Sequence, residues 1–147
     1  MASTTWVLVA NASLAKLYAN QGPNTGLAPL RDFEHPSSRL KNSDLVSDRA
    51  GHMQSAGLGH GSRQPQTEPK QHEAKLFAQT LARELQAGRT KREYRRAIVV
   101  APPAFMGLLK GALDEPTAEM VSDHFDKDYT RATPKELGDL LSSCLYV

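Results

Sequence analysis

Two continuous runs of apolar residues indicate strands that are buried on both faces of a sheet. One run covers residues 6–10, and the other covers residues 97–101 and continues directly into Pro102 and Pro103. A short unbroken apolar run between turn signals is typical of an interior strand. The second strand should end at the prolines because neither can donate a backbone hydrogen bond, and Pro103 is well placed to begin a helix. We expect residues 97–101 to form the central strand of an α/β domain.

The N-terminal part of the chain predicts two further strands. In residues 15–20 the small or apolar side chains occupy the odd-numbered positions and mostly polar ones the even-numbered positions. This alternation indicates a half-buried strand that pairs with residues 6–10 as a hairpin. A turn rich in Gly, Pro and Asn at 22–26 leads to a weaker strand at 27–34, in which Pro29 favours an edge position.

The second half of the chain alternates helical patterns with strands. A long helix is predicted with Pro69 near its first turn and Gly88 just after its end. Its apolar face consists of Ala74, Phe77, Ala78, Leu81 and Leu85. A shorter helix follows Pro103, with Phe105, Leu108, Leu109 and Ala112 on its apolar face. The sequence Asp114-Glu115-Pro116 then predicts a brief helical turn.

The C-terminal residues predict an edge strand and a last helix. Residues 122–129 are assigned to the edge strand, although their periodicity is weak. Thr133 and Glu136 flank Pro134 in the pattern of a capping box, which marks a helix start. The inward side chains of that helix are expected to be Leu137, Leu140, Leu141, and Cys144 or Leu145. The prediction is one α/β domain over residues 1–147, in the order βββ-long loop-αβα(α)βα, with helices on the sheet faces in either two or three layers.

The segment 35–66 breaks the apolar pattern and forms a loop that is unusually long for a compact domain. Loops of this length are commonly functional or disordered. The segment 35–66 and the start of the next helix together contain four of the five histidines: His35, His52, His60 and His72. Their spacings match no zinc pattern, so we interpret them as solvated side chains and expect neither a metal nor another cofactor.

Two short stretches of this loop have competing interpretations. Ser47-Asp48-Arg49 is typical of a turn stabilised by its Asp side chain, but the planar guanidinium of Arg49 also suits a phosphate or carboxylate. The glycine-rich residues 57–61 allow close approach to a ligand. They do not lie between a strand and a helix at nucleotide-binding spacing, so flexibility is the simpler interpretation.

Residues 89–96 are basic at five of eight positions, with Tyr94 among them. Such a run can contact a phosphate backbone, or it can keep the entry to a hydrophobic strand soluble. The formal net charge of +2 is too small to indicate nucleic-acid binding by itself. The single cysteine, Cys144, excludes an intramolecular disulfide. No apolar segment approaches the length of a membrane span, and no signal-peptide pattern is recognised, so we expect a cytoplasmic protein.

The order of three strands followed by alternating helices and strands suggests a ribonuclease H-like mixed sheet. A two-metal nuclease needs several carboxylates at strand ends. Asn11 follows the first strand where an Asp would be required, and Asp123, Asp126 and Asp128 lie together on one late segment. Nuclease activity is therefore disfavoured, and no catalytic residue is predicted.

Several motifs, in this order and over nearly the whole chain, resemble the bacterial host attachment protein family. They are Trp6-Val7-Leu8-Val9-Ala10-Asn11, His35-Pro36, Ser47-Asp48-Arg49-Ala50-Gly51, Phe77-Ala78 with Leu81, Ala101-Pro102-Pro103-Ala104-Phe105-Met106-Gly107 and Lys127-Asp128-Tyr129-Thr130. That family is similar to the central domain of archaeal and eukaryotic class 1 translation release factors, so the resemblance implies a ribonuclease H-like fold. In those factors the corresponding loop carries Gly-Gly-Gln, which is absent from residues 35–66 here.

The leading hypothesis is a module that associates with RNA or the ribosome and has little or no enzymatic activity; any activity would be hydrolysis of peptidyl-tRNA. The predicted loop contacts are Ser47, Asp48, Arg49, His52, His60 and Arg63. The predicted nucleic-acid-binding residues are Arg89, Lys91, Arg92, Arg95 and Arg96. One alternative is a non-catalytic surface protein that serves attachment to a host cell through protein or glycan contacts. Another is a regulatory domain that binds a partner protein through its loop.

Overall fold

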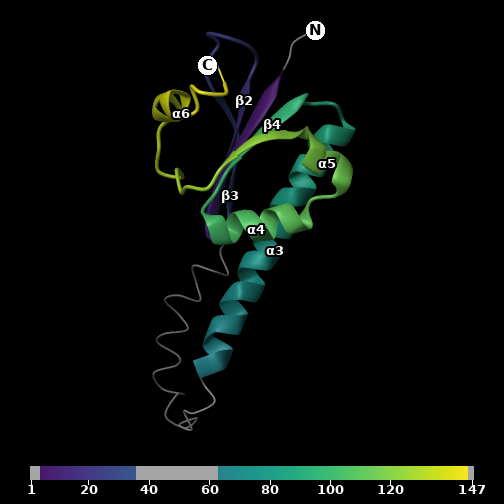
Figure 1. The fold of residues 1–147 in the computed structure, drawn as a ribbon, viewed down its shortest axis with the longest axis vertical. Coiled ribbons are helices and arrows are strands. Elements are labelled where there is room, and N and C mark those ends of the chain that lie inside the picture. Colours follow the sequence, from purple (N-terminus) through teal and green to yellow (C-terminus); the bar gives the residue numbers. More distant parts are fainter. Residues whose placement is uncertain (1–3, 36–62, 146–147) are drawn as a thin grey trace.

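The computed structural model describes residues 4–35 and 63–145, which form a five-stranded mixed sheet flanked by helices (Figure 1). The sheet order is β3-β2-β1-β4-β5. The strands are β1 (Thr5–Ala10), β2 (Leu14–Asn20), β3 (Ala28–Glu34), β4 (Arg96–Val100) and β5 (Val121–Phe125). The helices are α3 (Arg63–Thr90), α4 (Pro103–Ala112), α5 (Glu115–Met120) and α6 (Pro134–Leu140).

The sheet joins an antiparallel half to a parallel half at β1. This strand pairs antiparallel with β2 and parallel with β4, while β3 and β5 form the two edges. The α/β class and the edge position of the strand with Pro29 are confirmed. The expectation that residues 97–101 form the central strand is wrong, because β1 is the middle strand and β4 lies beside it. Both strands are buried on both faces, so their apolar pattern does not distinguish these two places.

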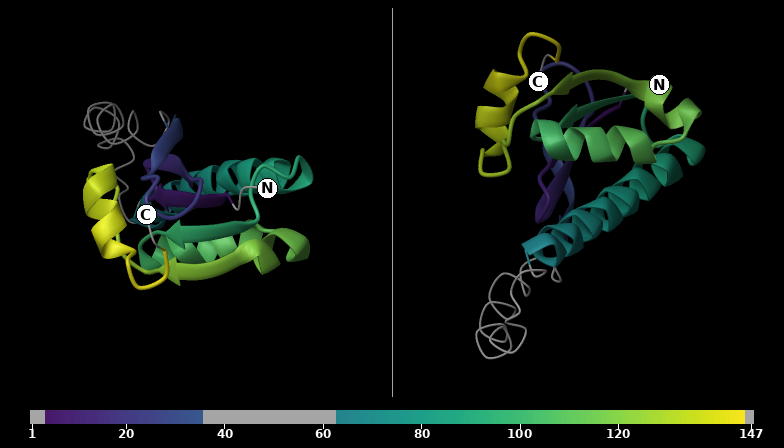
Figure 2. Two further views of the ribbon diagram at one scale, coloured as in Figure 1. Left: turned by 90° about the horizontal axis from the view of Figure 1, so that it is seen from above. Right: turned by 60° about the horizontal axis from the view of Figure 1, so that its bottom comes forward.

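Side chains alternate between two hydrophobic clusters, one on each face of the sheet. On one face Trp6 and Leu8 pack with residues of α3 and α4. On the other face Val7 and Val9 pack with Leu137 and other residues of and after α6. Figure 2 shows α6, in yellow, apart from the long helix α3, in teal. Helices therefore cover both faces of the sheet in a three-layer arrangement, where the sequence left two or three layers open.

Helix α3 is longer than predicted at both ends. It begins at Arg63, before the predicted end of the loop at residue 66, and its first turns extend away from the sheet (Figure 1). Gly88 is not the residue that follows the helix, because the helix continues to Thr90. The left-handed residue is Arg92, with φ 58°. Its N–H donates to the carbonyl of Arg89 at 3.0 Å, and the next N–H donates to that of Gly88 at 2.8 Å, which is a Schellman motif.

Gly88 is instead required by packing. A Cβ at this position would lie 2.5 Å from Cζ3 of Trp6 and 3.0 Å from Cε2 of Tyr94. The rings of Trp6 and Tyr94 contact each other, with centroids 4.6 Å apart. Burial raises the pKa of Tyr94 to about 12, because its effect outweighs the opposite effect of the nearby Arg89. The Tyr94 hydroxyl donates to the carbonyl of Leu85 at 2.6 Å.

The C-terminal predictions are confirmed with two changes. The edge strand is shorter than residues 122–129, because β5 ends at Phe125. The capping box at Thr133 and Glu136 is present. Leu137 and Leu141 are buried as expected, whereas Leu140 is 42% exposed and does not face the core. Among the described residues, no helix is long and apolar enough to cross a membrane.

Candidate functional site

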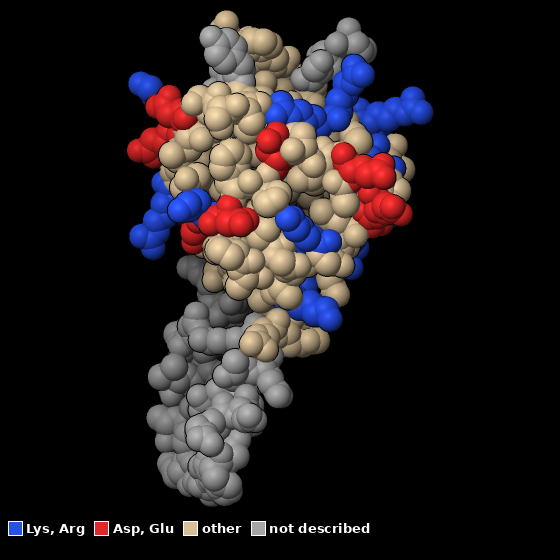
Figure 3. Space-filling view, viewed as in Figure 1, with Lys and Arg blue, Asp and Glu red and all other residues tan. Residues whose placement is uncertain are grey.

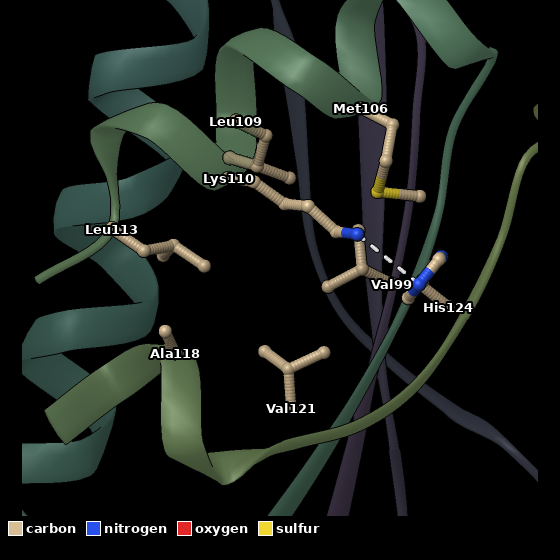
Figure 4. Close-up of a pocket in the computed structure, with 8 residues that line it drawn as sticks. All are labelled: Val99, Met106, Leu109, Lys110, Leu113, Ala118, Val121 and His124. Carbon is tan, nitrogen blue, oxygen red and sulfur yellow. Dashed lines mark hydrogen bonds between the residues drawn. The ribbon is translucent and has the colours of Figure 1, made fainter. Parts of the chain in front are cut away.

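A hollow of about 280 Å3 lies between α4, α5 and the sheet (Figure 4). Its floor and walls are almost entirely apolar. The lining residues are Val99, Met106, Leu109, Lys110, Leu113, Ala118, Val121 and His124. Small-molecule sites are typically concave and apolar, with a few placed polar groups. This hollow has that composition, with Lys110 and His124 as its two polar side chains.

Lys110 and His124 hydrogen-bond to each other across the hollow (Figure 4). The distance from Lys110 Nζ to His124 Nε2 is 3.1 Å. An ammonium group has no lone pair, so it donates and Nε2 accepts. The other ring nitrogen of His124, Nδ1, lies 3.5 Å from Oδ1 of Asp126. Lys110 is left with two further N–H donors at the rim of an apolar space.

A register shift in the sheet brings His124 to this site. The pairing of β4 with β5 shifts between Ala97 and Ile98, whose partners are Val121 and Asp123. Ser122 is the extra residue, as in a β-bulge. Residues three apart in a regular strand point to opposite faces, but after this shift Val121 and His124 both line the hollow.

Helix α5 forms one wall and is held by hydrogen bonds at its start. The carboxylate of Asp114 caps it by accepting from the backbone N–H of Thr117 at 3.1 Å. Hydrogen bonds from Thr117 and, less strongly, the nearby Arg89 keep the pKa of Asp114 below its ordinary value. Arg89 Nε also donates to the hydroxyl of Thr117 at 3.0 Å. Arg89 therefore connects the end of α3 to α5.

A second polar cluster joins the carboxyl end of β1 to the segment after β5. Asn11 Nδ2 donates to Asp128 at 3.0 Å and to Thr130 at 3.3 Å, while its Oδ1 accepts from the N–H groups of Ser13 and Leu14. Burial acts to raise the pKa of Asp128, but hydrogen bonds from Thr130 and Asn11 together outweigh it, and the pKa is lowered. These groups satisfy one another, so the cluster fixes the turn after β1 against the C-terminal segment.

His35 is the one loop histidine whose contacts the structure describes in detail. Its Nε2 lies 2.8 Å from Oε1 of Glu73, and its ring stacks on Phe77 with centroids 5.2 Å apart. His35 is therefore held against α3, which differs from the solvated side chain expected. His72 is exposed. Among the residues that the structure describes, no group of three or more potential ligands is placed to hold a metal ion.

The predicted loop contacts Ser47, Asp48, Arg49, His52 and His60 lie outside the described residues, and Arg63 is the first residue of α3. The predicted nucleic-acid-binding residues divide into two groups. Arg96 donates to Ser122, to Asp123 and to the carbonyl of Cys144, and Arg89 is bound to α5 as described. Lys91, Arg92 and Arg95 are exposed.

The exposed basic residues lie where α3 ends and β4 begins. Figure 3 shows Lys and Arg side chains gathered at this upper end of the molecule, with Asp and Glu side chains beside them. Tyr94, which was predicted to interleave with the basic residues, is 3% exposed and is not available to stack on a base. The run therefore contributes three exposed cations, with the other two tied to side chains or carbonyls of the same chain.

Sequence reasoning did not find the hollow. Lys110 and His124 are fourteen positions apart and belong to no known motif. His124 was the one histidine outside the loop region, but nothing in its neighbourhood predicted the shift at Ser122. Only the assembly of α4 against β5 brings the two side chains together.

The sheet order, the helices on both faces and the apolar hollow define a mixed α/β protein that has a small concave site beside its parallel strands. A family model described as "Protein required for attachment to host cells" matches residues 6–141 of the chain. The chain belongs to this host attachment family. A comparison with curated proteins found no match.

Proposed function

We propose that this protein serves the attachment of a cell to its host by non-catalytic binding. The observation that carries the proposal is membership of the host attachment family over residues 6–141. The polar groups around Asn11 and Asp128 at the carboxyl end of β1 hydrogen-bond to one another, which supports a structural rather than a catalytic role for this cluster.

The proposal is tested by deleting the gene and counting cells that remain attached to host cells after washing. Attachment should fall in the deletion strain and return when the gene is supplied on a plasmid. The substitution Leu137→Asp places a charge in the core. A plasmid that carries this variant should not restore attachment. Unchanged attachment in the deletion strain, with growth also unchanged, would contradict the proposal.

The location of the protein decides whether the attachment role is direct. We propose a cytoplasmic location, the expectation from the sequence, in which the protein would act on attachment through another protein of the same cell. Fractionation combined with labelling of intact cells by an impermeant reagent tests this. Labelling of the protein in intact cells would contradict the cytoplasmic location and favour direct contact with the host.

Association with RNA or the ribosome is the second candidate function. The supporting observation is the group of three exposed cations at one end of the molecule, Lys91, Arg92 and Arg95. Cations that neutralise phosphates give binding that weakens as salt rises. Tagged protein should then sediment with ribosomal subunits at low salt and remain at the top of the gradient at raised salt.

A matched pair of triple variants makes this test specific. Changing Lys91, Arg92 and Arg95 to Glu should abolish co-sedimentation. Changing the exposed Lys75, Lys127 and Lys135 to Glu alters the net charge equally and should leave co-sedimentation intact. Equal loss in both variants would indicate non-specific attraction, and no sedimentation of the native protein would exclude this function.

We also propose the ribonuclease H-like architecture and the relation to release factors that the sequence resemblance implies. The strand order β3-β2-β1-β4-β5, with three antiparallel strands followed by two parallel ones, supports this architecture. The chain lacks Gly-Gly-Gln, so we expect no peptide release from ribosomes charged with peptidyl-tRNA. Release above the rate without protein would show a hydrolase instead.

A further inference from the structure

We propose that the hollow between α4 and β5 binds a small carboxylic acid with an unbranched aliphatic chain. The chain would lie against Leu113 and Val121, above the buried Leu109, and the carboxylate would accept hydrogen bonds from Lys110 at the rim. Neither the host attachment role nor ribosome association assigns a ligand to these residues.

The size of the hollow sets the length of the ligand. One water-sized group, such as a methylene, occupies ~30 Å3. The hollow of about 280 Å3 therefore holds about nine such groups. Octanoate has an aliphatic chain of that order, and its carboxylate would remain outside, at the rim. This volume lies just below the usual range for ligand sites, ~300–1,000 Å3, so the hollow suits one short chain.

The charge of the rim sets the polarity of the head group. Among the residues that the structure describes, Lys110 is the one charged residue in the lining, and no acidic side chain lines the hollow. Asp126 is near His124, but it faces the Nδ1 side of the ring, whereas Lys110 binds the Nε2 side. An ammonium with two spare donors above an apolar floor favours an anion over a cation or a neutral group.

The hollow is built from rigid parts of the fold. Leu109 is fully buried beneath it and Met106 is 4% exposed, while α5 is fixed by its cap at Asp114 and by Arg89. Ala118 contributes only a methyl group to the wall, so a larger side chain there would fill the space. A preformed apolar site costs little to order when a ligand binds.

The experiment is an NMR titration of the full-length protein with octanoate, following the methyl signals of Met106, Leu109, Leu113 and Val121. We expect these signals to shift in a saturable manner, while the methyl signals of Leu137 and Leu141 on the opposite face of the sheet do not. Octylamine should produce no saturable shift. Octanol should bind about tenfold more weakly than octanoate, because it lacks the charge that Lys110 recognises.

Two variants and one control test the assignment to these residues. Ala118→Phe should abolish the shifts by filling the hollow. Lys110→Met keeps the aliphatic stem and should weaken octanoate about tenfold without changing the affinity for octanol. Lys135→Met removes an exposed lysine on α6 and should have no effect.

The proposal is overturned if octanoate at millimolar concentration shifts none of the four methyl signals. It is also overturned if Lys110→Met binds octanoate as well as the native protein does, or if octylamine competes equally. Melting curves of each variant are recorded as well, and only variants that unfold cooperatively are compared. This readout does not depend on host attachment, so either proposal can fail while the other stands.

Discussion

Gly88 is the residue at which packing opposes helix propensity most directly. Replacing a glycine inside a helix with alanine normally stabilises the protein by about 0.5–1 kcal/mol. Here the new Cβ would meet Trp6, which is 3% exposed, 2.5 Å from its Cζ3 atom. Overpacking of a rigid core costs about 1–3 kcal/mol, so we expect Gly88→Ala to lower the free energy of unfolding, as measured in urea.

Gly107 provides the control for this substitution. It lies within α4, and a Cβ there would meet no atom of the described residues within 4 Å. Gly107→Ala should therefore show the ordinary gain in stability, about 0.5–1 kcal/mol. If both substitutions stabilise the protein equally, the contact between α3 and Trp6 is not as close as the structure has it.

Asn11 allows a prediction about pH. In Asn11→Asp a second carboxylate would replace the amide nitrogen that lies 3.0 Å from Oδ2 of Asp128. Two partly solvated carboxylates at this distance should destabilise the protein by about 1–2 kcal/mol at pH 7. Like charges raise the pKa of one member of the pair, and this penalty is relieved as pH falls through that raised value.

The native protein should respond to acid in the opposite direction. The pKa of Asp128 is lowered in the folded state, so its stabilising contribution is present above the ordinary Asp value of about 3.9 and is lost as pH falls through the lowered value. Urea unfolding at pH 7 and pH 4 measures the relief in the variant, and a further series at pH values below about 3.9 measures the loss in the native protein. The difference in stability between native protein and variant should shrink toward pH 4, and a constant difference would contradict the argument.

At the scale of elements, the end of α3 depends on an arginine in a conformation that favours glycine. Arg92 occupies the left-handed position of the Schellman motif with φ 58°. A non-glycine residue there costs about 1 kcal/mol. We expect Arg92→Gly to raise the free energy of unfolding by about 0.5–1 kcal/mol in urea. Arg95→Gly, also exposed but with its backbone N–H bound to the carbonyl of Thr4, should not gain stability.

The same helix shows how far sequence patterns predict elements. The apolar face from Ala74 to Leu85 was predicted correctly because burial follows the 3.6-residue period. The end was misplaced because Gly88 is a strong stop signal when considered alone. Its actual role depends on Trp6, which is more than eighty positions away. Leu140 was misassigned for a different reason. Helix α6 ends at this residue, and Leu141 and Leu145 after it are the side chains that face the core.

The candidate site was less predictable than the strands and helices. The strands follow from local apolar runs, but the hollow depends on how two elements meet. The extra residue Ser122 turns His124 toward α4, and no local signal marks such a shift. Arg89 and Arg96 were predicted as phosphate contacts because charge alone does not distinguish an exposed cation from one that donates to Thr117 or Asp123.

At the scale of the whole molecule, the middle strand should make unfolding cooperative. β1 is the strand through which the antiparallel part of the sheet meets the parallel part, and its side chains enter both hydrophobic clusters. Trp6 is the single tryptophan, and its fluorescence reports on the cluster formed with α3. Loss of Trp6 fluorescence and loss of helical circular dichroism should therefore share one midpoint in urea.

A substitution on the face of the sheet opposite Trp6 makes this test of cooperative unfolding stringent. Leu137 on α6 is fully buried in the cluster that excludes Trp6, and Leu137→Ala should cost about 3 kcal/mol. In a cooperative unit this loss moves the fluorescence midpoint of Trp6 as far as the dichroism midpoint, although α6 does not touch the tryptophan's cluster. If the fluorescence midpoint stays in place while α6 melts earlier, the two faces of the sheet unfold separately, and β1 does not couple them.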